Sequence, residues 1–562
     1  MGQVVRSRRV IGLAGVVAAL VVSPILGGCS LHQAGVEPPD NRIFFPSGGV
    51  VDPDGRWLYV VNSNSDLRYN AGTVVAVDLD NVKADDPRSA AFDPARGRWE
   101  PCSNDPRYVP EADAPHVCCW DHVDPTILNC DEQAHIKREW SVRIGSFAGA
   151  PAIQKFVERN DMFDPKDAAK GPEFTESFGL NRRLFVPVRG DGSITMMNLA
   201  NNAAPAEATK FTCTGDRLGA NVLMPPVGRA PQEPFARCED TWRITRKDDP
   251  LVNPVFKDIP DDQVLRLPPE PYALAIDDPS HLLFVGHLQG AVSLIDLGLA
   301  DAIGDRDTGK PQVPNLIDRN TGVLPGDSRG ATGVTSLTIR PSDSCGKEVF
   351  ATSRFAPLSR SFVTYGLHGA RCGAASDGSE SDEGLVIIPT GASYATGLSG
   401  SDTRGIEFVN SSYAHSAPSD PVQYDRVFLI QRFPPTLVGI DTATQLPLST
   451  MEICQGPTNM TQPRNQDGQP LFGIPLLSIT CYDSGELYVV DPSGPRIQSV
   501  IPLGREPITT VFDSTDPTRA YVIGFGGNNV SVVDLDPSSP THDRVIQRIG
   551  YPSAVPRPVG AK

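Results

Sequence analysis

Cysteine and histidine residues gather in one stretch that could hold a metal ion. Residues 118–122 read Cys-Cys-Trp-Asp-His, and Cys130 and His135 follow. Thiolates and imidazoles are the ligands that zinc and copper favour in proteins. Structural zinc sites, however, pair their ligands as C-x2-C and H-x3–5-H, and this stretch has neither element. We therefore expect these cysteines to form disulfides in preference to a metal site.

The first 28 residues resemble the signal peptide of a bacterial lipoprotein. Three arginines precede an apolar segment, residues 10–22, that is short for a membrane span. Leu26-Gly-Gly-Cys29 then resembles a lipobox, which implies that Cys29 carries diacylglycerol and becomes the mature N-terminus. An ordinary secretory signal with a chance cysteine is the alternative.

A lipidated Cys29 would tether the protein to a membrane, because several acyl chains on one residue give stable anchoring. Residues 29–41 would form the tether. In signals of this type an aspartate after the cysteine favours the inner membrane, and this chain has Ser30 there. We therefore expect a protein of the bacterial cell envelope, at the outer membrane in preference to the inner, that faces the periplasm or the cell surface.

The cysteine count also fits an exported chain. There are eleven cysteines, so lipidation of Cys29 would leave an even ten, which indicates disulfides. Proximity suggests three local pairs: Cys213 with Cys238, Cys345 with Cys372, and Cys454 with Cys481. Three connectivities stay open for the other four: Cys102, Cys118, Cys119 and Cys130.

Four aspartates near the start of the mature chain could offer carboxylate ligands to calcium: Asp52, Asp54, Asp78 and Asp80. Asp54 precedes Gly55, which is ordinary turn chemistry, and aspartates that end strands commonly bond to turn amides. We therefore predict no cofactor, with calcium as the minor alternative.

Motifs of catalysis give little guidance. The H-E-x-x-H zinc motif, the C-x-x-C-H haem motif and the G-x-x-x-x-G-K-S/T phosphate loop are absent. His281 and His287 flank one strand, where hydrogen bonds to turns explain them most simply. A quinone cofactor above a Cys118–Cys119 disulfide is disfavoured, because the tryptophan-rich motifs of quinoprotein dehydrogenases are missing from a chain with five tryptophans. We assign no catalytic residue.

Residues 50–79 show which elements would position any site. Asp52-Pro-Asp-Gly55 predicts a tight turn, because proline presets φ and glycine accepts a positive φ. Residues 57–61 and 73–77 are β-branched and aromatic runs that are typical of strands. Together they predict an antiparallel hairpin.

This hairpin resembles the repeat unit of the YVTN-type β-propellers. The matching residues are Pro53-Asp-Gly55, Leu58-Tyr-Val-Val-Asn62 and the strand from Val74 that ends in Asp78-Leu79. The resemblance implies that residues 50–79 form most of one propeller blade.

Six further units of the same kind follow, which begin near residues 183, 271, 333, 406, 476 and 507. We predict an all-β protein, a seven-bladed β-propeller over residues 42–551 with a C-terminal tail at 552–562. Two stacked β-sandwiches are the alternative. Two long disulfide-containing insertions, residues 81–140 and 200–265, interrupt the repeats. Residues 544–549 are expected to supply the outer strand of the first blade and so to fasten the chain ends.

Charge narrows the possible partners. A net charge of −17 makes nucleic acid an improbable partner. We expect a lipid-anchored module that binds or scaffolds a protein, peptide or glycan through its insertions, and not an enzyme. The alternative is a propeller enzyme, either a lactonase-like hydrolase or a metal- or quinone-dependent oxidoreductase, that acts in the central channel.

Overall fold

The structure is a computed structural model of the chain. It describes residues 35–86, 88, 118–121, 123–155, 180–200, 211–214, 236–252, 254–297, 314–322, 333–340, 348–354, 360–368, 385–394, 401–410, 425–465 and 468–550. The predicted signal peptide, the predicted C-terminal tail and four of the cysteines discussed above lie outside these residues: Cys29, Cys102, Cys345 and Cys372.

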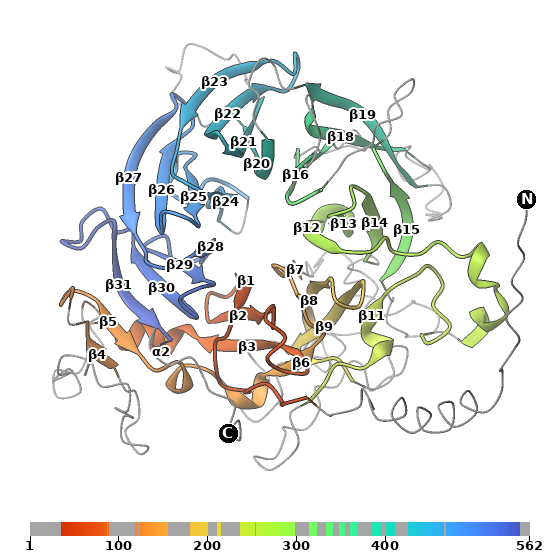
Figure 1. The fold of residues 1–562 in the computed structure, drawn as a ribbon, viewed down its shortest axis with the longest axis horizontal. Coiled ribbons are helices and arrows are strands. Elements are labelled where there is room, and N and C mark those ends of the chain that lie inside the picture. The colour runs from red at the N-terminus through yellow and green to blue at the C-terminus, as the bar shows by residue number, and fades with distance from the viewer. Residues whose placement is uncertain are drawn as a thin grey trace, which may run out of the picture.

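The described strands form seven sheets around a central axis, the blades of a β-propeller (Figure 1). The innermost strands are β1 (Pro46–Val51), β7 (Ala152–Lys155), β12 (Pro271–Asp277), β16 (Leu337–Ile339), β20 (Ser401–Asn410), β24 (Pro457–Thr461) and β28 (Pro507–Phe512). The second strands are β2 (Trp57–Asn62), β8 (Leu180–Val188), β13 (Leu282–His287), β17 (Glu348–Thr352), β21 (Asp425–Phe433), β25 (Leu477–Cys481) and β29 (Arg519–Gly524). The sheets confirm the predicted all-β, seven-bladed fold.

The outer half of each blade repeats the same antiparallel order. The third strands are β3 (Gly72–Asp78), β9 (Ser193–Ala200), β14 (Val292–Asp296), β18 (Arg360–His368), β22 (Pro435–Asp441), β26 (Glu486–Asp491) and β30 (Asn529–Asp534). The fourth strands are β6 (Val142–Ile144), β15 (Asn315–Asn320), β19 (Val386–Tyr394), β23 (Pro447–Glu452), β27 (Arg496–Pro502) and β31 (Arg544–Ile549), while two short strands of the second insertion complete blade two.

The hydrophobic core lies in layers between successive blades. Every residue of β2 and β3 is buried, because each face of the first sheet packs against a neighbour. Residues of blades one, two and three share one cluster, and residues of blades one and seven share another. This stacking explains why the strands read as nearly continuous apolar runs.

The sixth blade differs from its predicted position. Its inner strand is β24, Pro457–Thr461, and the predicted first strand near Leu476 is the second strand, β25. The sequence of β24, PTNMT, is short and mostly polar, so that strand propensity alone does not reveal it.

The expected closure of the ring is wrong. Residues 544–549 form β31, which is the outer strand of their own blade, and the outer strand of the first blade is β6. The ring is fastened by the first insertion. Its hairpin, β4 (Cys118–Trp120) and β5 (Leu128–Cys130), extends the seventh sheet, and β5 pairs with β31 in parallel.

Charged groups next to helix α2 (Leu79–Ala84) reinforce this closure. Lys83 lies 3.1 Å from Asp513, and Asp86 lies 3.0 Å from Arg519. Arg88 pairs with Asp534 at the end of β30. We call the hairpin β4–β5 and these ion pairs the closing seam, because they join the first blade to the last.

The second insertion completes blade two. Its strands β10 (Phe211–Thr212) and β11 (Arg243–Ile244) both pair with β9, and a disulfide joins Cys213 to Cys238 in the cluster between the first three blades. In the described parts of the two insertions the 3-10 helices are η1 (Glu132–Ala134), η2 (Arg138–Trp140), η6 (Asp240–Trp242), η7 (Pro254–Asp258) and η8 (Asp261–Gln263), and a further one, η9 (Asp278–Ser280), follows β12. No helix in the described part of the chain is long and apolar enough to cross a membrane.

Each inner strand begins with the same backbone feature. A residue with positive φ precedes the strand in six blades, and in blade five it is the second residue of β20: Phe45, Phe147, Glu270, Gly333, Asp402, Gly456 and Glu506. In six blades its carbonyl accepts a hydrogen bond of 2.8–3.3 Å from a backbone N–H one or two residues after the second strand. In five blades the pairing then skips one residue, a β-bulge. Bulges re-aim side chains, and the residue that the pairing skips in each of these five blades lines the central cavity.

Candidate functional site

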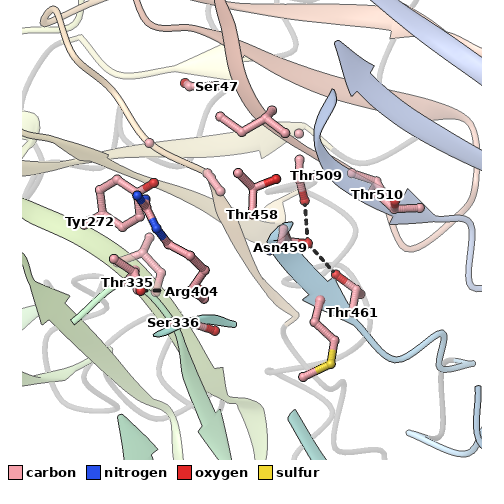
Figure 2. A pocket seen from close by; sticks show the side chains of 18 of the residues that line it. Ser47, Tyr272, Thr335, Ser336, Arg404, Thr458, Asn459, Thr461, Thr509 and Thr510 are labelled. Carbon is pink, nitrogen blue, oxygen red and sulfur yellow. Dashed lines mark hydrogen bonds between the residues drawn. The ribbon is translucent and has the colours of Figure 1, made fainter. Parts of the chain in front are cut away.

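A cavity of about 680 Å³ lies on the axis of the propeller, and all seven blades contribute to its wall. Sites for small molecules typically measure ~300–1,000 Å³, so this cavity has room for one. Figure 2 shows that its labelled side chains are mainly hydroxyl-bearing, with one tyrosine and one arginine among them.

The residues two positions after the positive-φ residues form a ring in this wall, which we call the inner ring. Its members are Ser47, Gly149, Tyr272, Thr335, Arg404, Thr458 and Ile508. The backbone repeats around the ring but the side chains do not, since one blade contributes a cation and another an aromatic ring. Packing of the blades does not require this asymmetry, which makes the inner ring a candidate binding surface.

Arg404 is the charged member of the inner ring. Its Nε lies 2.7 Å from Oδ1 of Asp402, and its Nη2 donates to Oδ2 at 2.9 Å. Oδ1 of Asp402 also accepts a hydrogen bond of 2.5 Å from Nε of Arg354, so one carboxylate serves two guanidinium groups. This pairing fixes one edge of Arg404, while the side chain extends toward Tyr272 in Figure 2.

Arg189 approaches Tyr272 from the second blade. Its guanidinium carbon lies 5.7 Å from the centre of the Tyr272 ring and 5.8 Å from the centre of the Phe147 ring. Its Nε donates to the Phe147 carbonyl at 3.4 Å. Among the described residues these partners are all neutral, so the positive charge of Arg189 has no carboxylate beside it.

A third arginine of the cavity wall, Arg432, is neutralised. Its Nη2 donates to both carboxylate oxygens of Asp483 at 2.9 Å, and its guanidinium lies over the rings of Phe433 and Tyr482. The charge of Arg432 is therefore neutralised by a protein carboxylate, and Arg432 is less available to a ligand than Arg189.

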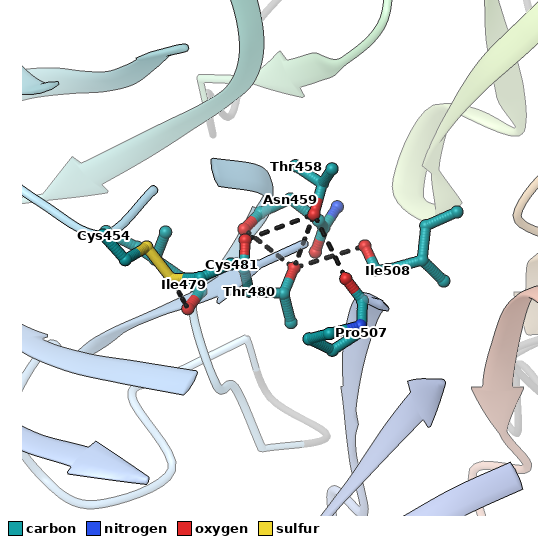
Figure 3. Close-up of a disulfide and its surroundings, with 8 residues drawn as sticks. All are labelled: Cys454, Thr458, Asn459, Ile479, Thr480, Cys481, Pro507 and Ile508. Atoms are coloured by element: carbon teal, nitrogen blue, oxygen red, sulfur yellow. Dashed lines mark hydrogen bonds between the residues drawn. A yellow bond between two sulfur atoms is a disulfide. The ribbon is translucent and has the colours of Figure 1, made fainter. Parts of the chain in front are cut away.

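Hydroxyl groups of the sixth and seventh blades are partly used to hold the blades together (Figure 3). Thr458 donates to the Pro507 carbonyl at 3.4 Å, and Thr480 donates to the Ile508 carbonyl at 3.2 Å. Thr461 and Thr509 both donate to Oδ1 of Asn459, at 2.9 and 3.1 Å (Figure 2). The disulfide between Cys454 and Cys481 anchors β25 beside this network (Figure 3).

Glu407 is the carboxylate among the residues that line the cavity. It is half-buried, and burial raises its pKa to about 7, an effect that Arg464 and the backbone N–H of Gln462 partly oppose. Arg464 in turn donates to the carbonyls of Gly468 and Phe408, at 3.0 and 2.9 Å. Glu407 therefore changes its charge near neutral pH.

The cavity is cationic although the chain is acidic. Four arginines and one glutamate line it, in a chain with 50 basic and 67 acidic residues. Asp483 neutralises Arg432. Arg404 shares its carboxylate partner with Arg354, and the partners of Arg189 among the described residues are neutral. Opposite unit charges about 4 Å apart attract by roughly 4 kcal/mol at an effective dielectric constant of ~20. Charges more than about 8 Å away are largely screened at physiological ionic strength. The local arginines therefore govern what enters, and the net charge does not.

Three disulfides join cysteines of the described residues. Two have the predicted pairing, Cys213 with Cys238 and Cys454 with Cys481. The third joins Cys118 to Cys130, and Cys119 is also disulfide-bonded, so Cys118 and Cys119 are not joined to each other. The predicted partners Cys345 and Cys372, together with Cys29 and Cys102, lie outside the described residues.

The possible metal ligands of the first insertion that the structure describes are held by protein partners, and His122 lies outside the described residues. Cys118, Cys130 and His135 lie within 4.8 Å of one another, but the two sulfurs are bonded together and offer no thiolate. His135 lies 3.6 Å from Asp85.

The four aspartates considered for calcium also have protein partners. Asp52 and Asp54 pair with Arg182 of the second blade, and Asp80 lies 3.4 Å from Arg56. Asp78 accepts from two backbone N–H groups at the start of α2. Cross-blade ion pairing and turn capping therefore account for these carboxylates.

The histidine that ends β13 behaves as predicted. The ring nitrogens of His287 lie 3.1 Å from the Pro269 carbonyl and 3.0 Å from the Ser293 hydroxyl, and burial lowers its pKa to about 4. It is a neutral structural residue in the wall of blade three.

Motif reading missed the arginines of the cavity, because no short pattern marks them. It also passed over Gly326-Asp-Ser-Arg-Gly330, which matches the G-x-S-x-G pattern of hydrolases. That segment lies outside the described residues and supports no role here.

Comparison with known proteins adds no family. No family model matches the chain, and no curated protein matches it. Among solved structures the chain is similar to hydrazine synthase of Kuenenia stuttgartiensis, with 11% identity, a TM-score of 0.40, and coverage of 91% of this chain and 99% of that chain. So distant a likeness implies nothing about activity. The strands themselves establish that the chain is a seven-bladed β-propeller.

Proposed function

We propose that this protein is a lipid-anchored binding module of the bacterial cell envelope that takes a small polar ligand of the glycan class into its central cavity. The observation that carries the proposal is the inner ring, where a repeated backbone presents hydroxyls, one tyrosine and one arginine. Carbohydrates are bound by such combinations, because hydroxyl and guanidinium groups bond to sugar hydroxyls while an aromatic face packs against the sugar ring.

Binding is favoured over catalysis by the chemistry of the wall. Glu407 is the one carboxylate among the described residues that line the cavity. Thr335 and Thr458 donate to backbone carbonyls of the next blade and are not paired with a base. A nucleophile beside a general base is thus not assembled from these residues.

One observation supports the enzyme alternative. A carboxyl group with a pKa of about 7 is suited to proton transfer at neutral pH, and Glu407 has such a pKa. A lactonase-like hydrolase that uses Glu407 as an acid or base is therefore the second candidate function.

The lipid anchor places the cavity outside the cytoplasm in this proposal. Cys29 would carry the lipid, and a short tether would hold the propeller at the outer membrane. The described parts of both insertions complete blades seven and two, so the cavity is a better candidate for the binding site than these parts are.

Two measurements test the proposal. Native mass spectrometry of the protein purified from the cell envelope, followed by a glycan array, is expected to show a bound carbohydrate whose affinity falls with Tyr272→Ala. Absence of any carbohydrate ligand would overturn the binding function, and turnover of a lactone that is lost in Glu407→Gln would establish the enzyme. For the anchor, Cys29→Ser is expected to abolish incorporation of labelled palmitate and to release the protein from membranes.

A further inference from the structure

Two arginines reach the same side of the cavity from different blades. Arg189 comes from the turn after β8, and Arg404 comes from the bulge of β20. Figure 2 shows Arg404 directed toward Tyr272, and Arg189 lies 5.7 Å from the centre of that ring. Tyr272 is thus the place where both guanidinium groups approach.

The two guanidinium groups are held in position, but part of each remains available to a ligand. Arg404 is clamped along its Nε and Nη2 edge by Asp402, and among the described residues this is the only hydrogen-bond or ion-pair partner of its guanidinium group. Arg189 is held by the rings of Phe147 and Tyr272 and by a carbonyl. Preorganised cations of this kind bind an anion with little loss of side-chain entropy.

The backbone supports this reading at Asp402. Asp402 has a φ of 63°, in the left-handed region that costs energy for residues other than glycine and that aspartate adopts more readily than most. Its carboxylate holds Arg354 and Arg404 at once. Positive φ recurs at this position in every blade, and in blade five the residue that adopts it also orients the charged member of the inner ring.

We propose that Arg189, Tyr272 and Arg404 form a subsite for the carboxylate of an acidic sugar such as a uronic acid. The inference rests on the proposed function and names the substrate class of that same cavity. The planar guanidinium groups match a carboxylate, Tyr272 packs against the apolar face of the sugar ring, and the hydroxyls of Ser47 and Thr335 complete the inner ring nearby.

The test compares acidic glycans with their own neutral counterparts. An array of uronate-containing oligosaccharides is probed with the wild-type protein before and after chemical reduction of the carboxylates to alcohols. We expect reduction to weaken binding by about tenfold or more, because the ligand loses at least one charge-assisted hydrogen bond to the arginines. Sulfated and phosphorylated sugars on the same array distinguish a carboxylate from other anions.

Variants locate the effect within the cavity. Arg404→Gln and Arg189→Gln are each expected to weaken binding of the acidic glycan about tenfold and to leave the reduced glycan within about twofold. Tyr272→Ala weakens both. The matched control, Arg496→Gln, changes an exposed arginine on the outer strand of blade six and is expected to change neither. Arg404→Lys, which keeps the charge but loses the fork, covers the case in which Arg404→Gln misfolds.

The outcomes separate the two proposals. Equal binding of acidic and reduced glycans, or preference for sulfated or phosphorylated sugars, overturns the carboxylate subsite and leaves carbohydrate binding intact. Binding to no member of the array overturns both. Loss of acidic-glycan binding in Arg496→Gln would show a nonspecific charge effect and would also overturn the subsite.

Discussion

The closing seam and the central cavity use charge in opposite ways. At the seam, the side chains of Asp86 and Asp534 are 1% and 0% exposed, and each lies against an arginine. In the cavity, Arg189 has neutral partners and Arg404 shares its carboxylate with Arg354. The charges of the seam are therefore paired with one another and stabilise the closed ring, whereas the cavity has cations that are available to a ligand. The difference shows that burial with a matched partner marks a structural charge in this protein.

Loss of a seam carboxylate is expected to have the largest effect. Asp86→Ala would remove the buried carboxylate that Arg88 and Arg519 share. The change costs about 3 kcal/mol of unfolding free energy, the lower end for a broken buried pair, because Arg88 keeps Asp534 and Arg519 keeps Asp516. Urea denaturation measures it. The control Asp80→Ala removes an exposed pair with Arg56 and is expected to cost within about 0.5 kcal/mol. Equal losses of stability in the two variants would show that buried and exposed ion pairs contribute equally, which would contradict this prediction.

Removal of the seam disulfide is expected to have an effect nearly as large. The Cys118→Ser/Cys130→Ser variant opens a loop with a sequence separation of 12, worth ~3 kcal/mol if loop entropy dominates. Because β5 pairs with β31, hydrogen exchange at β31 is expected to accelerate more than exchange at β20. Uniform acceleration in all blades would contradict a local closure at the hairpin.

Acid is expected to weaken the seam and not the cavity. Hydrogen bonds and ion pairs with arginines outweigh burial and hold the pKa values of Asp86 and Asp534 below those of unfolded chains. Their stabilisation is present above the unfolded pKa of ~3.9 and is lost as pH falls through the lower folded pKa values. Urea denaturation between pH 6 and pH 2 is expected to show this loss, and Asp86→Asn is expected to reduce it. An unchanged pH profile in Asp86→Asn would show that the loss of stability in acid does not come from Asp86.

Glu407 is expected to have the reverse dependence. Burial raises its pKa to about 7 in the folded state, so its contribution to stability is complete below the unfolded pKa of ~4.3 and is lost as pH rises through about 7. The same ionisation adds a negative charge beside Arg464. Affinity for an anionic glycan is therefore expected to rise a few-fold between pH 8 and pH 6, and Glu407→Gln is expected to abolish that rise in calorimetric titrations. A rise that survives in Glu407→Gln would belong to another group.

The smallest effect is expected at a hydroxyl that joins two blades. Thr458→Val removes the bond to the Pro507 carbonyl and is expected to cost ~1 kcal/mol. The Ser47 hydroxyl donates a weak hydrogen bond of 3.4 Å to the Val61 carbonyl of its own blade, so Ser47→Ala is expected to cost less. In thermal unfolding, a larger loss of stability in Ser47→Ala than in Thr458→Val would contradict this order, because the bond within blade one would then matter more than the bond between two blades.

Local patterns predicted the fold because strand and turn chemistry is local. Asp52-Pro-Asp-Gly55 does form the turn between β1 and β2. The aspartates that end β26 and β30 bond to turn amides, and the one that ends β3 caps helix α2. The closure could not be predicted in this way, because the pairing of β31 depends on which sheet edge lies beside it in space. A hairpin more than 400 residues away along the chain takes that edge.

The cavity could be predicted only in part. Aligning the seven units on Gly456-Pro457 and Glu506-Pro507 would place Arg404 and Tyr272 at one equivalent position. Sequence does not show that a bulge turns this position toward the axis, since the bulge arises from pairing between strands.

The central claim is that the charges of the seam stabilise the ring and the charges of the cavity bind a ligand. One crossed measurement tests it most directly: unfolding free energy and acidic-glycan affinity, both determined for Asp86→Ala and Arg404→Gln. The account predicts that Asp86→Ala loses about 3 kcal/mol of stability and keeps its affinity wherever it is folded, while Arg404→Gln loses about tenfold in affinity and within about 1 kcal/mol of stability. If Arg404→Gln instead destabilises the protein as much as Asp86→Ala and binds the glycan normally, Arg404 is a structural residue and the account is wrong.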